Sequence, residues 1–197
     1  MSSMKWTTSP YNENVYKNSP HRIMFMALEP NGDKEFGVTD MGEWLRKEIE
    51  PGVFLNRVKA ITNGILSGLN IDEPMDHIKL VDWKATPGTA KADHLSLYEE
   101  YVSNNISEVS SYFSGDDYPN YIIILGRYPK KLFIKFKDKL PLNDKTKAVF
   151  MPQAAPEYGI AKGALESAAK KLSLDTLEKK SNKFKSITSD FLFYWRY

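Results

Sequence analysis

Two carboxylates lie where short apolar runs of the sequence end. Glu29 directly follows the run Arg22–Leu28, and Asp82 lies near the end of the run His77–Trp83. Runs of this length and apolarity are typical of buried strands. In an open parallel sheet the functional site collects at the carboxyl ends of the strands, so we expect both carboxylates there. One hypothesis is therefore a small-molecule hydrolase on a flavodoxin-like scaffold that uses these two side chains.

The spacing of apolar segments predicts an α/β fold. Two further runs, Tyr121–Leu125 and Ala148–Met151, complete four predicted strands. The helical candidates between and after them are Asp40–Glu50, Leu55–Leu69, Ala92–Phe113, Lys130–Lys139 and Ile160–Leu172. Alternation of this kind predicts a three-layer α/β/α sandwich with a central, mainly parallel four-stranded sheet. We expect one domain over residues 21–175, an N-terminal extension over 1–20, and a basic and aromatic C-terminal extension over 176–197 that packs on the domain.

The four loops that follow the predicted strands share a chemical character. Each contains proline and three contain glycine, which suits sharp turns that present backbone groups. Ordinary turn chemistry explains this equally well for any single loop. The loops are Leu28–Asp33, Asp82–Gly88, Gly126–Pro129 and the segment around Gln153–Pro156 in "VFMPQAAPEYG". The centre of the last loop, Gln153-Ala154-Ala155-Pro156, contains no group that ionises.

Taken together, these loops resemble the uracil-DNA glycosylase superfamily, most closely its single-strand-selective monofunctional branch, over about residues 20–172. Ala27–Gly32 takes the place of the first family motif, Gly-Met-Asn-Pro-Gly in that branch. Met41–Leu45 is similar to the helix that ends in Trp-Leu, and Ile124–Gly126 to the third strand with its terminal glycine. Asp82 falls where the family has a base-reading asparagine, and Gln153–Pro156 aligns with His-Pro-Ser-Pro.

The resemblance implies a catalytic pair and a set of substrate-binding residues. Glu29 would stabilise the cationic sugar that forms when an N-glycosidic bond breaks, and Gln153 would donate a hydrogen bond to the departing base. Phe36 would stack on the base, or else belong to the core. The other implied binding residues are Asn31, Gly32, Asp82, Arg127, Tyr128 and Pro156. Because histidine and serine are replaced in the last motif, standard uracil excision is expected to be weakened, altered or lost.

Asp82 changes the base that the implied site would recognise. An ionised aspartate only accepts hydrogen bonds, whereas the asparagine of the family both donates and accepts. Asp82 is therefore expected to prefer a base with an amino group, such as cytosine, or to bind a uracil-like base in its protonated form. Alternatively, Asp82 pairs with Lys84 or Arg127 and reads nothing.

Composition excludes several kinds of chemistry. The 197-residue chain has no cysteine, which removes thiol nucleophiles, disulfides and cysteine-ligated metals. Its three histidines, His21, His77 and His94, show no ligand spacing, so we expect neither a metal nor a cofactor. The sequence shows no signal peptide and no run of about 20 apolar residues, which favours a cytoplasmic monomer without a membrane span.

The distribution of charge leaves the partner open. Net charge is +2, but residues 127–147 contain eight basic and two acidic side chains. Such a run is either a solvated helix face or a surface that contacts phosphates. The resemblance implies that the partner is DNA, single- or double-stranded, or a free nucleobase or nucleotide. Arg127 and Tyr128 would face the same site, or Arg127 would form a surface salt bridge. The alternative to a glycosylase is a catalytically inactive binding module of the same fold.

Overall fold

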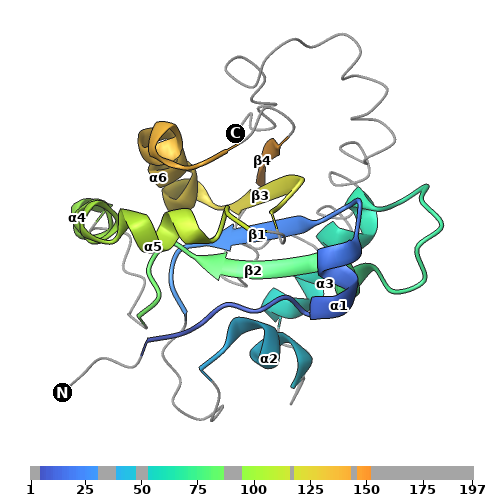
Figure 1. Cartoon of the computed structure of the whole chain (residues 1–197). Coiled ribbons are helices and arrows are strands. Elements are labelled where there is room, and N and C mark those ends of the chain that lie inside the picture. Colours follow the sequence, from blue (N-terminus) through green and yellow to red (C-terminus); the bar gives the residue numbers. More distant parts are fainter. Residues whose placement is uncertain are drawn as a thin grey trace, which may run out of the picture.

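The computed structural model describes residues 5–30, 39–47, 53–86, 95–115, 118–142 and 146–151 (Figure 1). Four strands alternate with helices, as the sequence predicts. The strands are β1 (Ile23–Ala27), β2 (Ile78–Asp82), β3 (Tyr121–Leu125) and β4 (Lys147–Met151). The helices are α1 (Glu13–Asn18), α2 (Met41–Arg46), α3 (Val53–Ile65), α4 (Leu95–Asn104), α5 (Ile106–Ser111) and α6 (Arg127–Phe136), with short 3-10 helices η2 (Pro74–His77) and η3 (Lys137–Lys139).

The four strands form one sheet in the order β2-β1-β3-β4, and every neighbouring pair is parallel. The predicted α/β class and parallel sheet are therefore confirmed. The chain steps from β1 to β2 in one direction and from β2 over β1 to β3, then to β4, in the other. Because such crossovers are right-handed, the two directions place their helices on opposite faces of the sheet.

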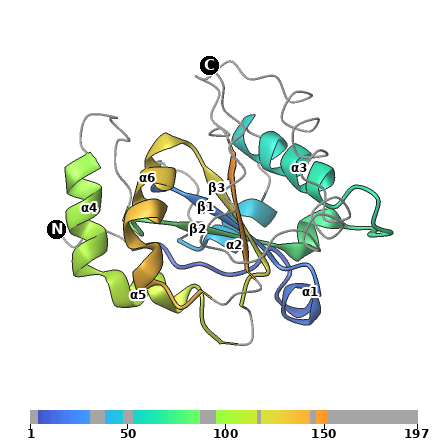
Figure 2. The ribbon, with the colours of Figure 1, turned by 90° about the horizontal axis from the view of Figure 1, so that it is seen from above.

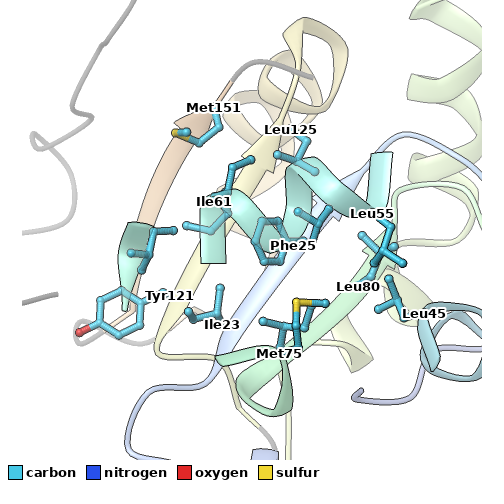
Figure 3. Packing of buried hydrophobic residues seen from close by; sticks show 14 of the residues in the cluster. Ile23, Phe25, Leu45, Leu55, Ile61, Met75, Leu80, Tyr121, Leu125 and Met151 are labelled. Carbon is cyan, nitrogen blue, oxygen red and sulfur yellow. The ribbon is translucent and has the colours of Figure 1, made fainter. Parts of the chain in front are cut away.

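Side chains from the two faces of the sheet form two separate apolar clusters. Alternate residues of β1, such as Ile23 and Phe25, pack with α2 and α3, and Figure 3 shows them beside Leu45, Leu55 and Ile61. The residues between them, Met24 and Met26, pack with α4, α5 and α6. Figure 2 shows the sheet between α3 and the group α4–α6, which is the expected three-layer arrangement.

The observed helices differ in extent from the predicted ones. The predicted helices Asp40–Glu50 and Leu55–Leu69 are observed as Met41–Arg46 and Val53–Ile65. The expected helix Ala92–Phe113 is divided at Asn105 into α4 and α5. The last basic helix begins at Arg127, three residues before the predicted start, because Gly126 adopts a φ of 95° at the N-cap and turns the chain directly from β3 into α6. The expected helix Ile160–Leu172 lies outside the described residues.

The N-terminal residues 5–19 lie along the β2 edge of the sheet. Pro10 forms an antiparallel bridge with Lys79, and the amide of Trp6 donates to the carbonyl of Ala85 at 2.8 Å. The Trp6 ring enters the α2–α3 cluster. At the same edge Asp40 caps α2 and accepts hydrogen bonds from Ser9, Thr7 and the amide of Glu43. This segment therefore covers the edge that β2 would otherwise expose.

Gly42 is expected to be required for this docking. A methyl group at Gly42 would lie 2.6 Å from the carbonyl oxygens of both Ser9 and Pro10, which are backbone atoms and cannot rotate away. Gly42→Ala is therefore expected to cost about 1–3 kcal/mol and to speed proteolysis of the N-terminal segment, although alanine favours helices. Gly68→Ala is the comparison, because Gly68 has φ 89° and open space around it. That change should cost about 1 kcal/mol without altering N-terminal proteolysis, and equal proteolysis of the two variants would contradict the expectation.

Candidate functional site

The β1–β2 ladder continues beyond the ends of the two strands. The amide of Trp83 donates to the carbonyl of Ala27 at 3.1 Å, and the amide of Lys84 donates to the carbonyl of Leu28 at 3.0 Å. Within the strands, Ala27 is the register partner of Asp82. These pairings bring the segment that carries Glu29 alongside the segment that carries Asp82 and Lys84, although more than 50 residues separate them in sequence.

Glu29 is a buried carboxylate with a partner at each oxygen. Lys84 Nζ lies 2.7 Å from Oε2, and the hydroxyl of Tyr98, from α4, donates to Oε1 at 2.7 Å. The Glu29 side chain is 1% exposed and that of Lys84 is 23% exposed. A carboxylate removed from water in this way requires such partners, because unpaired burial costs several kcal/mol. Within the described residues, the carboxylate oxygens of Glu29 therefore contact two side chains, Lys84 and Tyr98.

Asp82 lies beside Glu29 and lacks a comparable partner. The residue is 3% exposed, and its Oδ2 makes no hydrogen bond within the part of the chain that the structure describes. Burial, followed by the negative charge of Glu29, raises the pKa of Asp82 to about 8. This shift favours the neutral carboxylic acid at pH 7, which is the second of the two forms that the sequence allows for Asp82.

Lys84 explains why the two carboxyl groups differ. Its ammonium group binds Glu29, donates to the carbonyl of Thr86 at 3.1 Å and lies 5.9 Å from the centre of the Tyr98 ring. The alternative in which Asp82 pairs with Lys84 is therefore wrong. Burial and the hydrogen bond to Glu29 also raise the pKa of Tyr98, so this phenol stays a donor. Of the two carboxyl groups, Glu29 is therefore the one whose charge Lys84 compensates.

The other predicted site residues are only partly located. Arg127 and Tyr128 begin α6, one residue after the end of β3. They therefore lie at the carboxyl ends of the parallel strands, as Glu29 and Asp82 do. Arg127 is exposed, and Lys131 Nζ lies over the ring of Tyr128, 5.8 Å from its centre. The remaining predicted residues, Asn31, Gly32, Phe36, Gln153 and Pro156, lie outside the described residues.

The polar cluster formed by Glu29, Asp82, Lys84 and Tyr98 contains two residues, Lys84 and Tyr98, that are missing from the sequence-based prediction of the site. Lys84 stands in one of the four loops, but the sequence places it equally well against Asp82. Tyr98 gives no local signal, because its contact with Glu29 joins residues that are 69 positions apart. A tyrosine on the buried face of a predicted helix is usually a core residue, so only the tertiary structure reveals its hydrogen bond.

No group of three histidine or acidic side chains within the described ranges is arranged to hold a metal ion. His77 is engaged elsewhere, with its Nδ1 2.6 Å from the hydroxyl of Ser19. Within the described residues, no helix is long and apolar enough to cross a bilayer.

Comparison with protein families and with curated proteins identifies no relative of this chain. No protein-family model matches the chain, and a search of curated proteins returns no significant match. The resemblance to uracil-DNA glycosylases therefore depends on the motifs quoted above and stays a prediction.

Proposed function

We propose that this protein binds a nucleobase, carried on single-stranded DNA or free, at the carboxyl ends of β1 and β2. The observation that carries the proposal is Asp82, a buried carboxyl group at a strand end whose Oδ2 has no hydrogen-bond partner among the described residues. Burying a polar atom without a hydrogen-bond partner costs about 1–3 kcal/mol. A ligand that forms a hydrogen bond with this atom removes that penalty. The strand-end position of Asp82 is where open parallel sheets bind ligands.

Hydrolysis of the N-glycosidic bond is the catalytic form of this proposal. The oxygen of a water molecule would bond to the sugar C1′, the C1′–N bond would break with its electron pair left on the base, and the base would take up a proton. Glu29 is the anion proposed to stabilise the cationic sugar. However, Lys84 already compensates its charge at 2.7 Å. This pairing favours slow cleavage, or the alternative of a binding module without catalysis.

Oligonucleotides separate these possibilities. Single strands that contain uracil, a modified cytosine or an alkylated base are incubated with the protein, treated with alkali and examined for strand breaks at abasic sites. Binding is measured on the same strands by fluorescence anisotropy. Breaks that Glu29→Gln abolishes support the glycosylase, whereas binding without breaks supports the module. If neither these strands nor free nucleosides bind, nucleobase binding is wrong.

The exposed face of α6 is the proposed contact for the DNA backbone. Arg127 and Lys131 lie on it four residues apart and both are exposed, while Lys135 is paired with Glu99 at 2.6 Å. The double variant Arg127→Glu/Lys131→Glu is expected to weaken single-strand binding at least about tenfold and to flatten its salt dependence, because each contact with phosphate releases counterions. Lys47→Glu, at the end of α2 on the opposite face, is the control and should change little. Equal losses in both variants would remove α6 from the interface.

A further inference from the structure

The environment of Asp82 decides which hydrogen bonds it offers to a ligand. Among the described residues, Glu29 after β1 and Tyr112 at the end of α5 interact electrostatically with Asp82. Lys84 and Tyr98 both bind Glu29, so the cation and the donor of the cluster are engaged by the neighbouring carboxylate. Asp82 is left buried beside a negative charge. This arrangement favours the protonated carboxyl group, consistent with its raised pKa of about 8.

A protonated carboxyl group has a different hydrogen-bonding pattern from a carboxylate. It offers one O–H donor and one carbonyl acceptor side by side, whereas the carboxylate offers acceptors only. Uracil presents an N–H donor beside a carbonyl acceptor, and cytosine presents a ring-nitrogen acceptor beside an amino donor. Each therefore matches the protonated form. Adenine presents the same acceptor and donor as cytosine, and the O6 acceptor beside the N1–H donor of guanine matches the protonated form as the corresponding groups of uracil do. Only guanine also presents two adjacent donors, which match the carboxylate.

We propose that Asp82 reads its ligand as a neutral acid, binding base edges that join one donor to one acceptor, and that loss of its proton in mildly alkaline solution releases them. This inference rests on the proposed nucleobase site and adds to it both a class of base edge and a proton switch. While it is protonated, the Asp82 side chain would offer one donor and one acceptor, as a carboxamide does. It would lose the donor when it ionises.

Deoxycytidine is the probe for the test, because its base does not ionise between neutral and mildly alkaline pH. Its dissociation constant is measured by calorimetry at about pH 6.5 and about pH 9. Only the protonated fraction of the wild type binds, so affinity should fall about tenfold at the higher pH. Asp82→Asn keeps a donor beside an acceptor and has no proton to lose, so its affinity should change less than about twofold. Asp138→Asn, an exposed acid in η3, should keep the wild-type pH profile.

The possible outcomes distinguish this inference from the proposed function. Wild-type binding that is independent of pH would overturn the neutral-acid reading while leaving the nucleobase site intact. Failure of the wild type to bind deoxycytidine, deoxyuridine or deoxyguanosine at either pH would overturn the site and the inference together. A carbon NMR titration of the Asp82 carboxyl group in the unliganded protein gives a second readout that needs no ligand and no variant. A midpoint below about pH 5 would contradict the inference, because an ordinary aspartate titrates near 3.9.

Discussion

Asp82→Asn is expected to stabilise the protein at pH 7 by about 2–4 kcal/mol, an effect opposite to that of most substitutions in a buried site. The pKa of Asp82 is about 8 in the folded protein, whereas that of an unfolded aspartate is about 3.9. Between these values the folded state holds a proton that the unfolded state has released. Wild-type stability attributable to this group therefore falls as pH rises from about 4 to about 8. Asparagine binds no proton in either state and escapes this loss.

Urea unfolding at about pH 4.5, 7 and 8.5 measures the effect. The difference between variant and wild type should be small at the lowest pH, grow through neutrality and level off above about pH 8. The difference isolates Asp82 from groups such as Asp40, where burial opposes but hydrogen bonds from Ser9 and Glu43 lower the pKa. Asp138→Asn serves as the exposed control and should leave the pH profile unchanged. Parallel profiles for Asp82→Asn and wild type would show that Asp82 is ionised in the folded protein.

Lys84→Met is expected to destabilise the protein by about 3–5 kcal/mol. The substitution preserves the apolar stem but removes the ammonium group 2.7 Å from Glu29 Oε2. It leaves a carboxylate that is 1% exposed with the Tyr98 hydroxyl, at 2.7 Å, as its remaining partner among the described residues. The loss of stability arises from this uncompensated charge. It is therefore larger than the net contribution of the ion pair to the free energy of unfolding. Chemical denaturation at pH 7 measures it.

A double-mutant cycle tests that explanation. Glu29→Gln/Lys84→Met removes both charges while glutamine still accepts from Tyr98, so much of the lost stability should return. Lys135→Met is the matched control, because it breaks an ion pair of similar length, 2.6 Å to Glu99, on the exposed surface. That change should cost about 0–1 kcal/mol. If Lys84→Met costs no more than Lys135→Met, or if the double variant is as unstable as the single one, Glu29 is not a buried charge that depends on Lys84.

The strands and their order of appearance were predictable because their signals are local. Five consecutive apolar residues such as Tyr121–Leu125 indicate a strand buried on both faces, and helices between such strands imply parallel pairing. The division of the predicted helix at Asn105 and the early start of α6 at Gly126 were not predictable in the same way. They depend on backbone geometry that propensity describes weakly.

The N-terminal segment shows a second limit of sequence patterns. Residues 5–19 read as a polar extension, yet Trp6 and Tyr16 are buried and Gly42 is surrounded by the carbonyl groups of Ser9 and Pro10. Single apolar residues that are separated by polar ones give no periodic signal of a helix or a strand. Their burial depends on the β2 edge that they cover.

By itself, the sequence determined that Glu29 and Asp82 would lie at the ends of two predicted strands, because strand ends are marked by local changes in hydrophobicity and by turn residues. That these two strands are neighbours in the sheet comes from the structure. Only the tertiary structure decided which carboxyl group receives Lys84, since that choice depends on how residues 55 positions apart meet beyond the β1–β2 ladder. It also decided the protonation state of Asp82. Burial and a neighbouring charge set a pKa, and neither exists until the chain has folded.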